Sequence, residues 1–267
     1  MYIKIFIYYI IMLKICEHQN KLLEVQNSTN NLDKILAPDI PVPLPNYSGF
    51  NMLIVGASGS GKTTLLYSIM SKKNKNKKRQ SYRKVFDKVY IISPTIGGES
   101  IKNDPFKNIP ENQKQKSLTL QGLEKLEEEL YENREDDLHS IVILDDVGSQ
   151  LRKNAQIEKK LIQMLQNRRH VFTSYVALLQ RFRDCPTGWR NNLSHFISFR
   201  PKNQIEYESI TKELMPYDSK KNKQIMDHIF ETDNNYCFIF IDMSLKNTNK
   251  YLFYNCFNPL EITEQGV

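Results

Sequence analysis

The sequence has few cysteines and few glycines, and none of its cysteines form a C-x-x-C pair. Its 267 residues include 4 cysteines, a number and spacing that argue against a zinc ribbon and against a disulfide-stapled secreted domain. Glycine (10) and proline (11) are too scarce for a collagen-like or low-complexity chain. We therefore expect separate, reduced and mostly buried thiols at Cys16, Cys185, Cys237 and Cys256.

The sequence also lacks a long hydrophobic run. The most apolar stretch, residues 5–13, lies between Lys4 and Lys14 and is shorter than the ~20 residues that a membrane-spanning helix needs. No small-residue cleavage site of a signal peptide follows it. We expect an ordinary strand or helix here, or a spurious extension if Met12 is the true start, and no stable membrane span.

The charge of the chain is concentrated in one segment. Hydrophobic residues make up 40% and charged residues 25%, which is typical of a globular protein, and the net charge is +7. Residues 72–88 hold nine basic residues and one acid, a local charge of +8, so the remainder of the chain is close to neutral. A stretch over 124–137 holds eight acids against two basic residues. The protein is thus a nearly neutral body with one basic loop.

Apolar periodicity predicts alternating strands and helices after a proline-rich segment. Residues 37–49 contain four prolines, which indicates an extended linker. Short, wholly apolar runs are typical of parallel strands buried on both faces. The sequence therefore predicts an α/β fold with a mainly parallel sheet flanked by helices. Strands are expected at 51–55, 85–92, 141–144, 171–179, 194–199, 236–242 and 251–254, and helices at 63–70, 118–135, 155–167, 204–215 and 219–230.

A phosphate-binding loop follows the first of these strands. The run GASGSGKT over 56–63 matches G-x-x-x-x-G-K-[ST] in full. Glycines let backbone N–H groups face phosphate oxygens, and the helix that begins there adds the positive end of its dipole. Lys62 is expected to reach the β- and γ-phosphates, and the Thr63 hydroxyl to ligate Mg²⁺. The predicted nucleotide-binding residues are Gly56, Ala57, Ser58, Gly59, Ser60, Gly61, Lys62, Thr63 and Thr64.

Two carboxylates end the apolar strand IVIL, about 80 residues further along the chain. In open α/β sheets ligands bind at the carboxyl ends of the strands, which is where Asp145 and Asp146 fall. Asp145 is expected to hold Mg²⁺ through its water shell, and Asp146 to orient and polarise the attacking water. Neighbouring side chains alternate across a strand, so two roles for two adjacent acids are geometrically reasonable.

Gln180 and a set of arginines complete the predicted catalytic residues. Gln180 ends the strand 171–179, where a side chain that both donates and accepts hydrogen bonds suits a γ-phosphate or water sensor. An arginine supplied across a subunit boundary stabilises charge on a transferring phosphoryl group. Arg169 is the first candidate for this role, with Arg168, Arg190 and Arg200 as rivals.

These motifs occur in the order found in a known superfamily. GASGSGKT, ILDD, NRRH before a strand ending in LLQ, then WRNN and ISF resemble the FtsK–HerA superfamily, in particular the genome-packaging ATPases of poxvirus-type large DNA viruses and virophages, over about residues 48–200. The resemblance implies an additional-strand (ASCE, RecA-like) P-loop NTPase that works as a homo-oligomeric ring, a hexamer, and moves double-stranded DNA with ATP. In that family the second acid is often Glu, so Asp146 is a departure.

The resemblance also implies how the chain is divided and what it binds. We expect residues 1–46 to be an N-terminal extension with a proline-rich linker, and 47–267 to be the ATPase domain with a basic insertion over 72–84. Implied cofactors are ATP and Mg²⁺, implied partners are DNA and capsid or portal components, and the implied location is the host cytoplasm (viral factory) or virion, with the nucleus left open. DNA-phosphate contacts are assigned to Lys72, Lys73, Lys75, Lys77, Lys78 and Arg79.

Other interpretations stay open at this point. The same basic residues suit a solvated loop or a nuclear-localisation signal. The same fold suits a HerA- or conjugation-type helicase or translocase. From another class, a P-loop small-molecule phosphotransferase shares the phosphate loop but needs an arginine-rich lid, and a nucleotide-binding structural protein of a particle has no need of hydrolytic acids.

Overall fold

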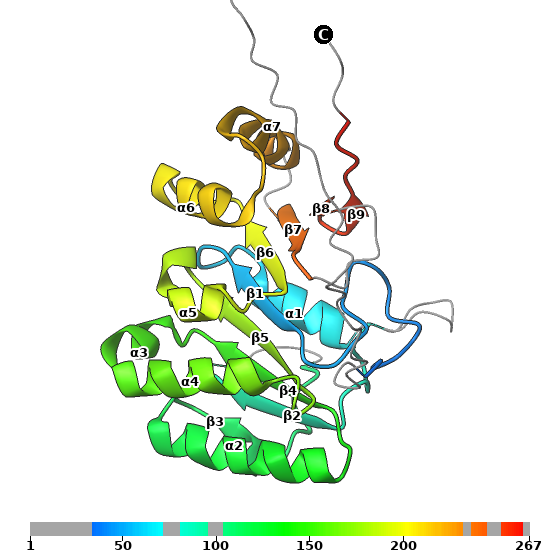
Figure 1. Cartoon of the computed structure of the whole chain (residues 1–267), viewed down its shortest axis with the longest axis vertical. Helices are drawn as coiled ribbons and strands as arrows, with labels where there is room; N and C mark the ends of the chain where they lie inside the picture. The colour runs from blue at the N-terminus through cyan, green and yellow to red at the C-terminus, as the bar shows by residue number, and fades with distance from the viewer. Residues whose placement is uncertain (1–33, 72–80, 96–103, 232–235, 245–251, 264–267) are drawn as a thin grey trace, which may run out of the picture. The chain divides into compact units, whose positions relative to one another are not determined.

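The computed structural model describes residues 34–71, 81–95, 104–231, 236–244 and 252–263. They form a nine-stranded sheet with the order β3-β2-β4-β5-β1-β6-β7-β8-β9, with helices on both faces (Figure 1). The sequence-based predictions for residues 1–33 and for the basic residues 72–79 lie outside the described residues. Among the described residues, no helix is long and apolar enough to cross a membrane.

The strands alternate with helices along the chain up to β7. The strands are β1 (Asn51–Val55), β2 (Lys88–Ile92), β3 (Lys114–Gln115), β4 (Ser140–Asp145), β5 (Thr173–Leu179), β6 (His195–Phe199), β7 (Phe238–Asp242), β8 (Phe253–Asn255) and β9 (Asn258–Pro259). The helices are α1 (Lys62–Ser71), α2 (Leu120–Glu135), α3 (Gly148–Lys153), α4 (Ala155–Asn167), α5 (Thr187–Arg190), α6 (Gln204–Leu214) and α7 (Ser219–Phe230). Short 3₁₀ turns lie at Glu111–Gln113 and Phe182–Asp184.

The sheet confirms the predicted fold class. All pairs from β3 to β6 are parallel, and β5 lies between β1, which carries the phosphate loop, and β4, which carries the acids. That inserted strand defines the additional-strand type. Beyond β6 the sheet changes character, because β7, β8 and β9 add to it in antiparallel order. The C-terminal part, for which the sequence shows no motif, thus extends the same sheet.

Alternation along the central strands builds two hydrophobic cores. On β1, Leu53 and Val55 belong to the core on the side of α2 and α4, whereas Met52 and Ile54 belong to the core under α1. Every residue of β1, β4 and β5 is buried. This two-sided burial is the reason why these strands are apolar throughout. The strand ends are therefore the places where polar groups of these strands can meet solvent.

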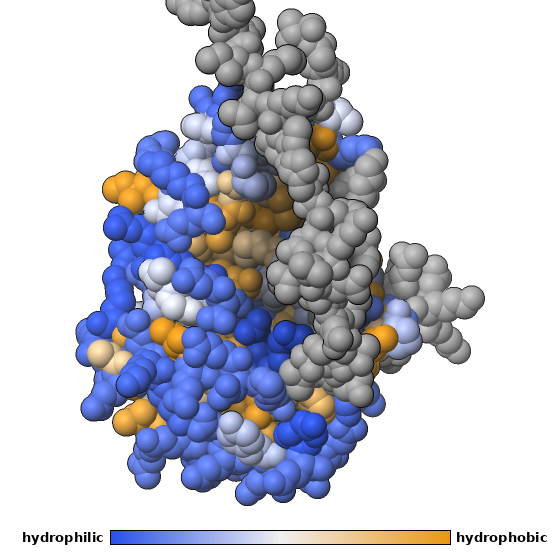
Figure 2. Space-filling view, in the orientation of Figure 1, coloured by the Kyte–Doolittle hydropathy of each residue, from blue (hydrophilic) through white to orange (hydrophobic). Residues whose placement is uncertain are grey.

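Side-chain caps and apolar spacing set the helices. Thr119 accepts a hydrogen bond from Gly122 N at the start of α2, and Asn154 does so from Gln156 N at the start of α4. The leucines of α2 face the core and its acids face solvent. Figure 2 shows that hydrophilic side chains dominate the surface over α2, α3 and α4, whereas apolar side chains gather beneath α6 and α7.

The proline-rich segment differs from the extended linker that its prolines suggest. It forms turns, with Ile40 N donating to Ala37 O and Leu44 N donating to Pro41 O. Ile40 and Leu44 are buried in the core under α1, so the segment is packed on the sheet domain. The reason is that its apolar residues alternate with the prolines and can reach the core. The domain boundary at residue 47 stays a prediction.

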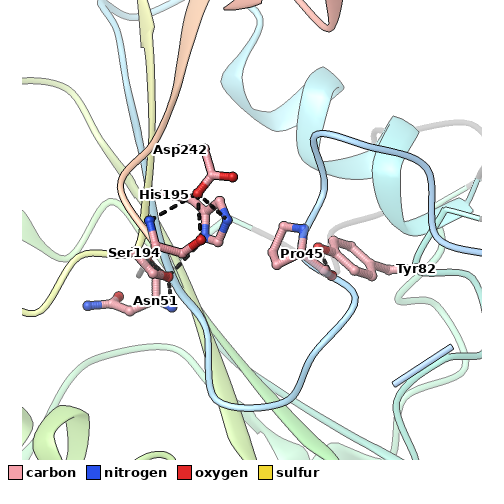
Figure 3. A network of polar contacts seen from close by, with 7 residues as sticks. Pro45, Asn51, Tyr82, Ser194, His195 and Asp242 are labelled. Atoms are coloured by element: carbon pink, nitrogen blue, oxygen red, sulfur yellow. Dashed lines mark hydrogen bonds and ion pairs between the residues drawn. The ribbon is translucent and has the colours of Figure 1, made fainter. Parts of the chain in front are cut away.

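A buried polar network lies where β1 and β6 begin. Asn51 N donates to Ser194 Oγ at 2.8 Å, Ser194 Oγ lies 2.9 Å from His195 Nδ1, and His195 Nε2 lies 3.4 Å from Asp242 Oδ1 (Figure 3). Beside it, Tyr82 Oη donates to Pro45 O. Burial lowers the pKa of His195 to about 3, so its ring is neutral. This network joins three strands and is structural.

We predict that His195 makes the stability of the protein sensitive to acid. The unfolded chain binds a proton on this ring below a pKa of about 6.5, whereas the folded chain does so only near pH 3, so stability is lost as the pH falls below about 6.5. His195→Gln removes the titrating ring. We expect the variant to be less stable than wild type. Urea denaturation should show that this difference in free energy of unfolding shrinks by roughly 1 kcal/mol from pH 6.5 to 5.5. A constant deficit over that range would contradict the assignment.

Candidate nucleotide-binding site

The phosphate loop folds as a cradle between β1 and α1. Gly59 and Gly61 have φ angles of +78° and +104°, which side chains rarely allow. Gly56 has no room for a side chain, because a Cβ atom there would lie 2.5 Å from Ser60 Oγ and 2.9 Å from Phe199 Cβ. The glycines of the motif are therefore required by the backbone and by close packing.

Lys62 lies within this loop. Its ammonium group donates to Gly56 O at 2.6 Å and to Ala57 O at 2.9 Å. Burial lowers the pKa of Lys62, while the negative charges of Asp145 and Asp146 raise it. The two carboxylates are thus close enough to act on the lysine electrostatically.

Asp145 is a buried carboxylate held by two hydroxyl groups. Ser93 Oγ donates to Asp145 Oδ2 at 2.9 Å, and Thr95 Oγ1 donates to the same oxygen at 3.1 Å. Burial raises the pKa of Asp145, and these two hydrogen bonds counteract that effect. Within the described residues both hydroxyls bond to Oδ2, which leaves Oδ1 for a further ligand.

Asp146 and Gln180 form a second, exposed pair beside it. The Asp146 backbone is left-handed, with φ of +54°, so the strand ends there and its side chain leaves the sheet in a different direction from Asp145. Gln180 Nε2 donates to Asp146 Oδ1 at 3.1 Å. The structure thus brings together the two acids, Gln180 and the phosphate loop.

The residues present fit a nucleotide with a magnesium ion. Ser60 Oγ is buried in the loop without a hydrogen-bond partner among the described residues, and Thr63 lies at the first turn of α1. Within the described residues, no group of three or more His, Cys, Asp or Glu side chains could hold a metal by itself. A carboxylate such as Asp145 and a hydroxyl such as Thr63 are oxygen ligands of the kind that Mg²⁺ takes together with phosphates and water.

The candidate arginines lie in three different places. Arg169 packs against Gly49 at the edge where β5 begins, and Arg168 Nε donates to Gly49 O at 2.8 Å. Arg190 pairs with Glu213 at 2.8 Å and is structural. Arg200 follows β6 at the same edge as the phosphate loop and donates to Phe230 O.

Arg169 is therefore remote from the phosphate loop of its own chain. β5 has seven residues, and Gln180 follows its far end. At about 3.3 Å per residue, that strand separates Arg169 from Gln180 by roughly 20 Å. The finger role predicted for Arg169 requires contact with the site of another subunit.

Three site residues escaped the sequence analysis. Ser93 and Thr95 follow β2, and only the pairing of β2 with β4 shows that they reach Asp145. Arg181 directly follows Gln180 and lines a cavity of about 50 Å³ beside Gly56 and Ala57. Its guanidinium is held by Asp184, at 3.1 and 3.0 Å, which fixes its direction. A hydroxyl-rich strand end was the available signal for Ser93 and Thr95.

The strand order and the loop geometry define a P-loop NTPase fold of the additional-strand type. A family model described as the poxvirus A32 protein matches residues 46–264, and the chain belongs to this family. It is 33% identical over 156 residues to the DNA packaging protein OPG160 of Vaccinia virus (strain Copenhagen), which is 56% of this chain and 53% of that protein. For the Monkeypox virus protein of the same name, identity is 32% over 154 residues, 56% of this chain and 47% of the relative. The chain spans about half the length of the curated relatives it matches.

Solved structures share the fold at low sequence identity. The DNA-packaging ATPase B204 from Sulfolobus turreted icosahedral virus has a TM-score of 0.53 at 13% identity, over 73% of this chain and 93% of that one. The genome packaging NTPase B204 from Sulfolobus turreted icosahedral virus 2, solved with AMPPCP, has a TM-score of 0.52 at 16% identity, over 79% and 98% of the two chains. These likenesses concern the fold.

We predict that Ser93 and Thr95 stabilise the ionised form of Asp145. Ser93→Ala with Thr95→Val removes both hydrogen bonds to Oδ2, so the free energy of unfolding at pH 7.5 should fall by about 1–3 kcal/mol. The loss should be smaller at a pH low enough to protonate the carboxyl, since the hydroxyls lower its pKa. Urea unfolding at several pH values measures this.

The control is the same double change made in an Asp145→Asn background. There the carboxylate is already absent, and the cost of losing the two hydroxyls should be clearly smaller. An equal cost in both backgrounds would show that the hydroxyls act on something other than Asp145.

Proposed function

We propose that this protein is an ATP-driven translocase of double-stranded DNA that packages a viral genome into its capsid. The observation that carries the proposal is the meeting of the phosphate loop with Asp145, Asp146 and Gln180 at one edge of the sheet. The relatives named DNA packaging protein and the packaging ATPases with the same fold supply the biological context.

Each residue of the site has a role in this proposal. Backbone N–H groups of residues 56–63 and the Lys62 ammonium bind the phosphates, since both carry positive charge into the loop. The Thr63 hydroxyl would hold Mg²⁺ directly, and the Asp145 carboxylate would hold it through a water molecule. The metal, when bound, neutralises charge that develops on the transferring phosphoryl group.

Asp146 and Gln180 act on the attacking water. The carboxylate of Asp146 accepts a hydrogen bond from that water and orients it, and Gln180 holds the carboxylate in position. Aspartate is one methylene shorter than the glutamate frequent in the resembling superfamily. The exposed, left-handed position of Asp146 compensates, because it directs the side chain away from the strand.

The proposed assembly is a homo-oligomeric ring, a hexamer, around DNA. Arg169 of one subunit completes the site of its neighbour, in agreement with its distance from its own phosphate loop. The basic residues 72–79, outside the described residues, supply DNA-phosphate contacts without reading sequence. Capsid or portal components are the proposed partners, and the host cytoplasm or the virion is the proposed location.

A specific observation disfavours a small-molecule phosphotransferase. β5 separates the phosphate loop from the acids and presents Gln180 beside Asp146. Within the described residues, Arg181 and Arg152 form ion pairs with Asp184 and are not part of an arginine-rich lid. We therefore favour transfer of the phosphoryl group to water as the reaction of this site.

Steady-state ATP hydrolysis, with and without linear double-stranded DNA, tests the proposal. We expect DNA to stimulate turnover, and turnover to rise more than linearly with protein concentration. Lys62→Ala should abolish turnover because it removes the cation in the loop. Asp146→Asn should bind ATP but hydrolyse it at least about a hundredfold more slowly.

Two results would contradict the proposal in different ways. Turnover that ignores DNA and scales linearly with protein would remove the motor and leave a nucleotide hydrolase. Full turnover by Lys62→Ala would remove the phosphate-loop assignment itself.

We predict that Arg169 acts only across a subunit boundary. Arg169→Ala and Lys62→Ala subunits, each inactive alone, should regain turnover when they are mixed, because an intact phosphate loop then meets the intact Arg169 of a Lys62→Ala neighbour. Arg190→Ala is the matched control, since Arg190 pairs with Glu213 of its own chain. A mixture of the two inactive variants that stays inactive would exclude a role in trans.

A further inference from the structure

The sheet order gives the bound nucleotide a direction. On one side of β1 lie β5 and β4, which carry Gln180 and the two acids that act at the γ-phosphate. On the other side the sheet continues with β6 and β7. Neighbouring strands are about 4.8 Å apart, so a nucleotide whose γ-phosphate faces β4 extends its nucleoside over the ends of β6 and β7. This step rests on the proposed function.

An aromatic ring lies at that place. β6 ends at Phe199 and pairs in antiparallel register with Phe238, so the chain that enters β7 passes beside the phosphate loop. Tyr236 lies two residues before β7. A Cβ atom on Gly61 would lie 3.3 Å from Tyr236 Cδ1 and 3.5 Å from Phe199 Cε1. The two rings therefore flank the glycine that precedes Lys62.

Tyr236 and Phe199 differ in exposure. Tyr236 is 65% exposed, whereas Phe199 is 3% exposed. Phe199 packs against Phe238, with ring centroids 5.5 Å apart, and Phe238 packs against Phe257 at 5.2 Å. The packed rings of Phe199, Phe238 and Phe257 support the phosphate loop, and Tyr236 presents an exposed ring beside that loop.

We propose that Tyr236 is the stacking platform for the base of the nucleotide held by the phosphate loop. An exposed aromatic ring beside a phosphate cradle offers a π-face at the position that the base reaches. Stacking of this kind tolerates different bases, because every base has a π-face. The ligand class is a nucleoside triphosphate, and the platform acts equally on adenine and guanine nucleotides.

Calorimetric binding of three probes to the full-length chain tests this assignment. The probes are the magnesium complexes of AMPPCP, GMPPCP and inorganic tripolyphosphate, which keeps the phosphates and lacks a base. Tyr236→Ala should weaken both nucleotides by about tenfold or more and leave tripolyphosphate unchanged. Tyr236→Phe, which keeps the ring, should bind all three within about twofold of wild type.

Tyr131→Ala is the matched control, because Tyr131 is an exposed tyrosine on α2 that lies beside Val171 and Tyr175, near the end of β5 away from the phosphate loop. It should bind all three probes as wild type does. Thermal unfolding of Tyr236→Ala checks that the variant is folded, and the Phe variant decides the matter if the Ala variant is not.

The experiment distinguishes failure of the stacking proposal from failure of the proposed function. Wild-type nucleotide affinity in a folded Tyr236→Ala overturns the platform while the proposed function stands. Equal weakening of tripolyphosphate also overturns it, because Tyr236 would then shape the loop and not contact a base. Weak nucleotide binding by Tyr236→Phe as well overturns stacking. If wild type and Lys62→Ala bind AMPPCP equally poorly, the proposed function fails first.

Discussion

Two backbone hydrogen bonds at the end of β5 hold the candidate site together. Gly56 N donates to Leu179 O, and Asp146 N donates to Leu178 O, both at 3.2 Å. Through them the first residue of the phosphate loop and the second acid are fixed to one strand, and Gln180 is the residue that follows it. Every geometric relation in the site depends on β5 lying between β1 and β4, because parallel strands bring their carboxyl ends to one edge.

The opposite edge of the sheet stabilises the fold. There the segment before β1 packs on the core, and the network of Asn51, Ser194, His195 and Asp242 joins β1, β6 and β7. Buried polar groups specify register when all of them are satisfied. A rigid edge of this kind lets the loops at the other edge carry strained backbone, such as the left-handed Asp146, without shifting the strands.

Much of the fold and the centre of the site could be predicted from the sequence. The phosphate loop, IVIL followed by two acids, and the strand before Gln180 are local patterns, and the structure has strands or helices at all of the expected positions that it describes. Short elements such as α3 and α5 were missed, because four to six residues show too little periodicity. The turns of the proline-rich segment were missed because packing, and not local preference, folds it.

The residues that sequence reasoning missed share a physical cause. Ser93 and Thr95 reach Asp145 only through the register of β2 on β4, and Tyr236 reaches the loop only through antiparallel pairing of β7 with β6. Register depends on contacts between segments far apart in the chain, which no single motif encodes. The motifs thus reveal the groups that act on phosphates, and the tertiary pairing reveals the groups that support them.

Charge coupling within the site explains why its buried members can remain ionised. Burial alone lowers the pKa of Lys62 and raises that of Asp145, which favours the neutral form of both. Each counteracts the effect on the other, and the hydroxyls of Ser93 and Thr95 add to the stabilisation of the carboxylate. Removing Asp145 would therefore also disturb Lys62. The charge of the exposed Asp146 also raises the pKa of Lys62 and that of Asp145, so Asp146→Asn keeps both members of the pair but changes the electrostatic field that acts on them.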